Sequence, residues 1–206
     1  MTEWRLSGEV VPYVSTREFH ANRERGPHLE QPHHQPRLHM AAEFLTDAAA
    51  RCHPPVTWSD LGCGDGGLLS LAQGVFSRAW GYDFQPSNAE GWPERSVSAE
   101  ALDVFGADRD KTRVGNVVSM TEVLEHLADP REVLAWLCSQ REVKWLVVSS
   151  PEFENSSYHC QEHAWAWDSE GYSDMITAGG WRIEKKASVA GGFQVVLASP
   201  EGVNLP

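Results

Sequence analysis

The strongest constraint on the fold is a run of glycines between a predicted strand and a predicted helix. Residues 56–62 (VTWSDLG) are typical of a short buried strand, and residues 67–76 (GLLSLAQGVF) carry apolar residues at helical spacing. Between them Gly62, Gly64 and Gly66 have no side chains, so the backbone can turn sharply and a ligand can lie against it. This order of strand, turn and helix is typical of a parallel α/β sheet.

A carboxylate completes the pattern of a nucleoside site. Asp83 stands at the end of a second predicted strand, 79–84 (AWGYDF), about 20 residues beyond the glycines. A carboxylate at that place can accept hydrogen bonds from both hydroxyls of a ribose. A glycine turn alone is compatible with a tight turn that binds nothing. The strand, turn, helix, second strand and terminal acid together indicate a bound nucleoside.

Strand and helix patterns alternate along the rest of the chain. Such alternation implies right-handed crossovers and a sheet with helices on both faces. The last two strands are close in sequence and should be antiparallel. The predicted fold class is therefore α/β, a doubly wound, mainly parallel, Rossmann-like sheet with an antiparallel edge. The other predicted elements are a helix at 37–52, a weakly marked strand near 98–104, strands at 116–120 and 143–150, helices at 131–140 and 169–179, and strands at 181–190 and 193–200.

Length and composition predict one domain with an appendage. The chain has 206 residues; residues 1–36 mix prolines and histidines without a period, which predicts an irregular arm or cap before a domain at 37–206. No apolar run approaches the roughly 18 residues of a membrane span. The first residues lack the pattern of a secretory signal, so a cytoplasmic location is expected. The four cysteines form no CxxC pair, which favours reduced thiols.

The charge balance limits the possible partners. The formal net charge is −12, whereas surfaces that bind nucleic acid usually carry a basic stripe. Long duplex contacts are therefore not expected. Recognition of a single terminal nucleotide remains compatible with an acidic body.

The acids around the glycine turn distinguish between nucleotide ligands. The spacing is GxGxG rather than the GxGxxG of dinucleotide sites, with Asp60 before it and Asp65 inside it. Extra carboxylates would repel a pyrophosphate but suit a cationic sulfonium and an ammonium group. The stretches DLGCGDGG, GYDFQPS and TEVLEHLADP resemble the class I S-adenosylmethionine-dependent methyltransferases over roughly residues 37–200. The family's cofactor-binding residues, carried onto this sequence, are Gly62, Gly64 and Gly66 along the methionine part, Asp60 and Asp65 near its amino group, Asp83 at the ribose and Asp103 at the adenine amino group.

A second group of reactive side chains follows the predicted strand 116–120. In TEVLEHLADP, Glu122, Glu125 and His126 come directly after that strand, at the edge where open parallel sheets bind ligands. If this segment is a helical turn, spacings of three and four put the three side chains on one face. They are then either metal ligands or a solvated or substrate-facing surface.

The loop after the strand 143–150 adds imidazoles at the same edge. Its sequence SSYHCQEHAWAWDSEGY contains His159 and His163, and two acids with two imidazoles could hold Mg²⁺, Mn²⁺ or Zn²⁺. The combination resembles the small-RNA 2′-O-methyltransferases that act on RNA 3′ ends, while EVLEHL is also similar to the ubiquinone-type O-methyltransferases, whose substrate is a catechol. The metal ligands that the first resemblance implies are Glu122, Glu125, His126 and His163.

The predicted function is methyl transfer from S-adenosylmethionine to a small-molecule hydroxyl, with Glu122, His126 and His163 as catalytic residues and with or without metal assistance. Without a metal, either histidine is the candidate base. The alternatives are transfer to the 3′-terminal ribose of an RNA, a dinucleotide oxidoreductase, which the glycine spacing disfavours, and a cofactor-binding partner domain without activity. Trp165 and Trp167 are expected to pack a lid. Possible substrate contacts from the leading arm are Tyr13, Phe19 and His20.

Overall fold

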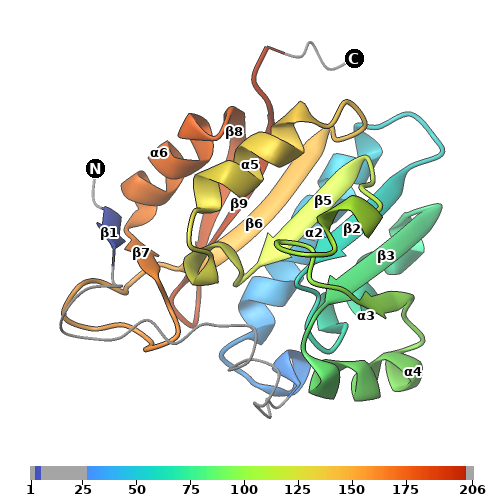
Figure 1. Cartoon of the computed structure of the whole chain (residues 1–206), viewed down its shortest axis with the longest axis horizontal. Coiled ribbons are helices and arrows are strands. Elements are labelled where there is room, and N and C mark those ends of the chain that lie inside the picture. Colours follow the sequence, from blue (N-terminus) through green and yellow to red (C-terminus); the bar gives the residue numbers. More distant parts are fainter. Residues whose placement is uncertain (1–2, 6–26, 203–206) are drawn as a thin grey trace.

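The structure, a computed structural model, describes residues 3–5 and 27–202. The possible contacts at Tyr13, Phe19 and His20 lie outside these residues. A sheet of seven strands crosses the molecule (Figure 1). From one edge to the other its strands are β4 (Ala99–Ala101), β3 (Arg78–Asp83), β2 (Thr57–Leu61), β5 (Val117–Thr121), β6 (Trp145–Pro151), β9 (Phe193–Pro200) and β8 (Trp181–Val189).

The sheet is mainly parallel, as predicted. The five strands from β4 to β6 run parallel, and β9 is antiparallel to both of its neighbours, β6 and β8. The antiparallel hairpin β8–β9 therefore forms one edge, which confirms the predicted fold class. Strand β6 (WLVVSSP) is buried along nearly its whole length because helices cover both of its faces.

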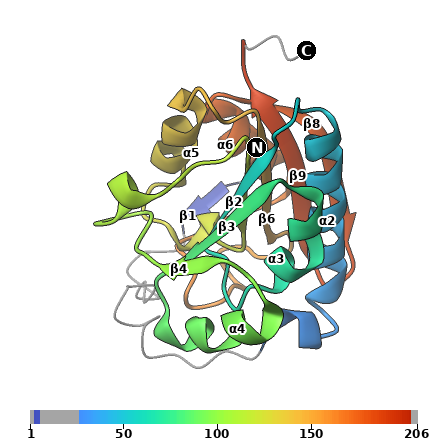
Figure 2. The same ribbon diagram turned by 90° about the vertical axis from the view of Figure 1, so that its right-hand side faces the viewer.

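Helices cover both faces of the sheet. In Figure 2, α5 and α6 lie on one side of the strands and α2 and α3 on the other. The α-helices are α2 (Gln35–Ala50), α3 (Gly67–Ala72), α4 (Trp92–Arg95), α5 (Pro130–Ser139) and α6 (Ser169–Ala178). The 3-10 turns are η1 (His28–Glu30), η2 (Gln73–Val75), η3 (Pro86–Gly91), η4 (Arg109–Lys111) and η5 (Leu124–His126).

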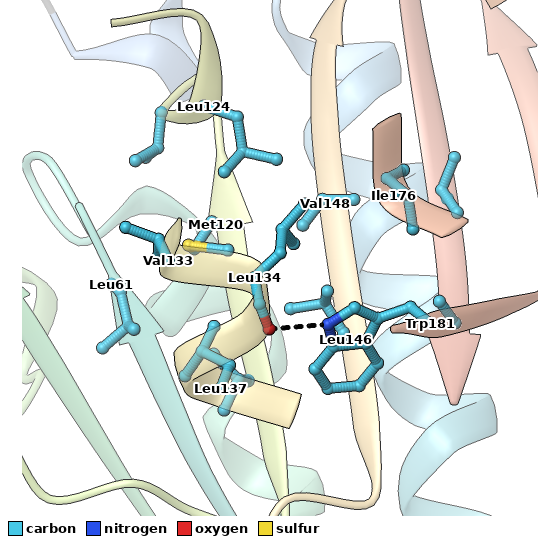
Figure 3. Close-up of a cluster of buried hydrophobic side chains, with 14 of the residues drawn as sticks. Leu61, Met120, Leu124, Val133, Leu134, Leu137, Leu146, Val148, Ile176 and Trp181 are labelled. Carbon is cyan, nitrogen blue, oxygen red and sulfur yellow. Dashed lines mark hydrogen bonds between the residues drawn. The ribbon is translucent and has the colours of Figure 1, made fainter. Parts of the chain in front are cut away.

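Each face of the sheet has its own apolar core. The core beneath α5 and α6 contains Leu134 and Trp181, whose indole Nε1 donates a 2.9 Å hydrogen bond to the Leu134 carbonyl (Figure 3). Both residues are fully buried, so this bond satisfies an indole that would otherwise lie without a partner in an apolar layer. The second core joins α2 and α3 to the opposite face.

Local signals explain where the helices begin and end. Asp129 caps α5, because its carboxylate accepts hydrogen bonds from the backbone N–H groups of Arg131 and Glu132. The helix predicted at 67–76 ends earlier as an α-helix, at Ala72, and continues as the 3-10 turn η2. The weakly marked third strand is present but covers only Ala99–Ala101.

One small sheet lies outside the main one. Strand β1 (Glu3–Arg5) pairs antiparallel with β7 (Trp165–Trp167), in the loop that follows β6. Residues 3–5 belong to the segment predicted to be irregular, and no local sequence pattern indicates this pairing. Within the part of the chain that the structure describes, no helix has both the length and the apolar character that a membrane crossing requires.

Candidate active site

A cavity of about 360 Å³ lies where the carboxyl ends of β2, β3, β4 and β5 meet. This volume falls in the range of sites for small organic ligands. The wall contains residues from the loop after each of these strands and from the segment around α2. Among the lining residues are His28, Leu38, Gly62, Gly64, Asp65, Asp83, Asp103, Glu122 and His126.

The glycine turn forms one wall of the cavity. The backbone N–H groups of Gly62 and Cys63 both donate to the Tyr82 carbonyl, at 2.8 and 3.0 Å, which holds the turn against the end of β3. A Cβ atom at Gly64 would meet nothing within 4 Å, so the backbone faces open space there. The turn therefore presents bare backbone to the cavity, as the sequence predicted.

Asp83, the predicted ribose contact, is held by hydrogen bonds to both of its carboxylate oxygens. One carboxylate oxygen accepts from the Gly64 N–H at 2.9 Å, and the other accepts from Gln85 N at 2.8 Å and from Asn88 Nδ2 at 3.0 Å. These bonds come from the turns after β2 and β3, so the carboxylate also ties the two loops together. Asp103, the predicted contact for the adenine amino group, lines the same cavity just after β4.

The other three predicted cofactor residues, Asp60, Asp65 and Gly66, differ in their relation to the cavity. Asp65 lines the cavity but pairs with Arg95, 2.7 Å away. Gly66 is the N-cap of α3 and is not among the residues of the cavity wall. Asp60 is buried beneath the turn, away from the cavity wall, and accepts a 2.5 Å hydrogen bond from the Ser119 hydroxyl. Burial raises its pKa to about 7, against the lowering effect of that hydrogen bond.

Glu122 is the first residue after β5 and lines the cavity. Its backbone has φ = 59°, an unusual value for a residue with a side chain and one that marks a strained turn. Its carboxylate accepts from the Ser149 hydroxyl at 3.1 Å and lies 4.0 Å from Nε of the buried Arg37. Burial raises the pKa of Glu122, and the Arg37 guanidinium opposes that rise.

Residues Leu124–His126 form the 3-10 turn η5 rather than a turn of α-helix, and Val123 is its N-cap. This turn and the later loop bring Glu125, His126 and His163 together, with one possible ligand atom from each within 4.8 Å of the others. Neither Glu122 nor His159 belongs to this group, which was the one cluster of metal-ligating side chains found in residues 3–5 and 27–202. The rings of His126 and His163 meet edge to face, with centroids 4.8 Å apart.

The comparison with known proteins decides the family. A family model described as a methyltransferase domain matches residues 33–181, most of the chain. The chain belongs to this methyltransferase family. It is a class I S-adenosylmethionine-dependent methyltransferase, as the sequence predicted. A search of curated proteins found no match.

Solved structures support the fold of this methyltransferase. The N-methyltransferase NodS from Bradyrhizobium japonicum, solved with S-adenosylhomocysteine, has a TM-score of 0.67 at 12% identity over 89% of this chain and 96% of its own. An O-methyltransferase family protein from Burkholderia thailandensis has a TM-score of 0.64 at 14% identity, and the match covers 82% of this chain but only 57% of that one. The methyltransferase domain of bacterial CtHen1 has a TM-score of 0.61 at 18% identity, over 81% and 99% of the two chains.

The donor set in this methyltransferase fits a divalent ion. Glu125 is fully buried, and neither of its carboxylate oxygens has a hydrogen-bond partner among the described residues. Burial raises its pKa well above the ordinary value, and the nearby Glu122 carboxylate raises it further. A cation beside Glu125 would oppose both effects and lower this pKa, because it stabilises the ionised carboxylate.

Hydrogen bonds fix the tautomer of both imidazoles. His126 Nδ1 donates to the Glu162 carbonyl at 3.1 Å, and His163 Nδ1 donates to the Glu154 carboxylate at 2.5 Å. In the neutral rings the lone pair is then on Nε2, which is the arrangement of histidines that bind metals. Ligands of one small divalent ion lie about 3 to 3.5 Å apart, so the three side chains would close by roughly 1 Å around it.

Two residues of this site gave no signal in the sequence. Arg37, in the first turn of α2, is fully buried, and its Nη2 lies 3.3 Å from Nδ1 of the cavity-lining His28. Tyr172 on α6 is fully buried, and its hydroxyl has no hydrogen-bond partner within residues 3–5 and 27–202. Burial raises the pKa of Tyr172 well above its usual range, and the neighbouring Glu125 raises it further. Their burial beside the acids follows from tertiary packing, which local spacing does not encode.

Proposed function

We propose that this methyltransferase transfers a methyl group to a hydroxyl oxygen, and that Glu125, His126 and His163 hold a divalent ion beside the cofactor cavity. The observation that carries the proposal is this group of three donors, with one carboxylate buried and unpaired in the described part of the chain. A buried carboxylate without a partner is costly unless a ligand or a proton compensates it.

The cofactor contacts of this proposal follow from the cavity. The bare backbone at Gly62 and Gly64 lies along the methionine part, Asp83 accepts from the ribose hydroxyls, and Asp103 contacts the adenine amino group. Asp65 lies close to the amino group but shares its charge with Arg95. In place of direct contact, the buried Asp60 supports the turn from below through Ser119.

The chemistry follows from what these residues orient. S-adenosylmethionine is already an activated methyl donor, so the rate depends mainly on holding the acceptor oxygen in line with the methyl group. A divalent ion at the proposed site would lower the pKa of an acceptor hydroxyl. Glu122 and His126 line the cavity, so both can contact the acceptor directly. Without an ion, Nε2 of His126 is the base that this geometry favours, since Nδ1 is committed to the Glu162 carbonyl.

A small-molecule hydroxyl, such as one of two adjacent hydroxyls on a ring, is the acceptor that the composition favours. The 3′-terminal ribose of an RNA is the second candidate, because its two neighbouring hydroxyls offer the same chelating pair. The resemblance of Glu125, His126 and His163 to the ligands of small-RNA 2′-O-methyltransferases supports it. The net charge of −12 weighs against extended contact with a phosphate backbone.

The proposal is tested by calorimetric titration of Mg²⁺, Mn²⁺ and Zn²⁺ into protein saturated with S-adenosylhomocysteine. Glu125→Gln and His163→Ala should each abolish stoichiometric metal binding, because each removes a proposed ligand. Neither residue lines the cofactor cavity, so binding of S-adenosylhomocysteine should be retained. His159→Ala is the matched control: its imidazole is in the same loop but outside the group, with Nδ1 bonded to the Asn155 carbonyl. Absence of binding to the wild type would reject the metal site and leave a histidine base.

The acceptor is tested separately. Catechols and short RNAs with a free 3′-terminal ribose are compared as acceptors, with phenols and 2′-deoxy-ended oligonucleotides as controls that lack the second hydroxyl. Methyl transfer only to catechols supports a small-molecule acceptor. Salt-sensitive transfer to RNA, lost with the 2′-deoxy end, supports the ribose.

A further inference from the structure

Hydrogen bonds hold one flank of β7 against the turn that carries the candidate ligands. They join the segment around His163 to η5 at three successive points, so the two segments keep a fixed register. The bonds, donor first, are His126 Nδ1 to the Glu162 carbonyl (3.1 Å), Ala164 N to the Glu125 carbonyl (2.7 Å) and Trp165 Nε1 to the Leu127 carbonyl (2.9 Å).

The other flank of β7 is held by the far end of the chain. Strand β1 pairs with it in the register Glu3 with Trp167 and Arg5 with Trp165. One carboxylate oxygen of Glu3 accepts from Trp167 Nε1 at 2.9 Å and from Arg131 Nη2 at 2.5 Å. The same guanidinium lies over the Trp165 ring, 5.8 Å from its centroid. A single carboxylate therefore joins β1, β7 and the start of α5.

The side chains at this junction leave little freedom. Trp167 is fully buried, stacks parallel to Trp165 at 6.2 Å and contacts Tyr172 at 5.5 Å, the residue whose hydroxyl lies near Glu125. A buried indole N–H needs an acceptor, and Glu3 supplies one from 164 positions away. Charge-assisted bonds of this kind are shorter and stronger than neutral ones.

We infer that Glu3 is a positioning residue of the active site. Through Trp167 and Arg131 it fixes β7, and β7 in turn sets the place of His163 opposite Glu125 and His126. The inference rests on the proposed function for its catalytic meaning, because it is the proposed ligand His163 that is being positioned. Strand β1 therefore contributes to the geometry of the site, although it lies outside the predicted domain.

The test uses the full chain with Glu3→Ala and Glu3→Gln. The amide variant keeps an oxygen that can accept from the indole but loses the charge that binds Arg131. Glu43→Ala is the control, because Glu43 is an exposed carboxylate on the outer side of α2. Affinities for Mn²⁺ and for S-adenosylhomocysteine are measured by calorimetry. Hydrogen exchange of the Ala164 amide, which bonds to Glu125, reports the position of the loop without any ligand.

Glu3→Ala should weaken Mn²⁺ binding roughly tenfold and leave S-adenosylhomocysteine affinity within about twofold. Residues that hold metal-binding side chains in place, without binding the metal themselves, have effects of this size on metal affinity. Exchange of the Ala164 amide should become at least about tenfold faster, with Glu3→Gln intermediate and Glu43→Ala unchanged. If the wild type binds no Mn²⁺, the proposed metal function fails, and the exchange rate alone decides the role of Glu3. Wild-type exchange at Ala164 in Glu3→Ala would overturn the inference, as would equal losses of Mn²⁺ and S-adenosylhomocysteine affinity.

Discussion

Replacing Gly62 with alanine should destabilise the protein by about 2 to 5 kcal/mol. Gly62 has φ = 78°, and a side chain in that left-handed region costs about 1 to 2 kcal/mol. The new Cβ would also lie only 2.5 Å from Cγ2 of Val123, a contact that must be relieved by movement. Val123 is buried and β-branched, so its side chain has few other positions, and overpacking of this kind costs about 1 to 3 kcal/mol more.

The matched control is Gly64→Ala. Gly64 also has a positive φ, 56°, but its Cβ would meet nothing within 4 Å, so only the backbone term of about 1 to 2 kcal/mol applies. Urea unfolding without cofactor measures both. Because Gly64 faces the cavity, its alanine variant should lose S-adenosylhomocysteine affinity while remaining folded. When Val123→Ala is added to the Gly62→Ala variant, it should restore part of the lost stability, because it removes the methyl group that the new Cβ would contact. Equal stability of the two glycine variants would refute the reasoning.

Three further predictions concern polar groups that are hydrogen-bonded inside the fold. Asp60 has its pKa raised from 3.8 to about 7, so the folded state binds a proton more tightly than the unfolded chain. The free energy of unfolding should therefore fall by roughly 3 kcal/mol between pH 5 and pH 8, at about 1.4 kcal/mol per pH unit up to the folded pKa, and Asp60→Asn should flatten that fall in urea titrations at these two pH values. Asp83→Asn should weaken S-adenosylhomocysteine binding at least about tenfold by calorimetry, because an amide cannot accept on both sides from the two loops. Trp181→Phe should lower stability by about 1 to 3 kcal/mol, since it removes the buried indole hydrogen bond to the Leu134 carbonyl and part of a fully buried ring system; an unchanged urea midpoint would contradict this.

The alternation of strands and helices could be predicted from the sequence because each element carries its own local signal. The apolar run of β6 and the cap of α5 at Asp129 depend on neighbours within a few positions. The cofactor turn was equally local, since Gly62, Gly64 and Asp83 stand at the ends of two consecutive strands. Asp60 shows the limit of reasoning from local patterns. The motif predicts an acid near the cofactor's amino group, whereas the Asp60 side chain lies beneath the glycine turn and is hydrogen-bonded to Ser119.

Strand β1 could not be predicted because three residues carry too little pattern to specify a strand. Its position depends on a partner, β7, that lies more than 150 residues away and is itself only three residues long. Short strands of this kind form because tertiary contacts hold them, here the bonds of Glu3, and not because of their own propensity. The buried Arg37 was missed for a related reason, since no local rule places an arginine in a core.

The ligand group shows what spacing alone can and cannot decide. Spacings of three and four place side chains on one face only if the segment is an α-helix, whereas Glu125 and His126 occupy a 3-10 turn that begins after a strained residue. What brings them to His163 is the carbonyl of Glu162 and the register of β7, neither of which a motif contains. Glu122 has the right spacing but lies outside the group, with its carboxylate held by Ser149 beside Arg37. Under the proposed function, its place on the cavity wall makes Glu122 a contact for the acceptor rather than a metal ligand. Glu122→Gln separates these two roles, since metal titration should then be unchanged while methyl transfer is reduced.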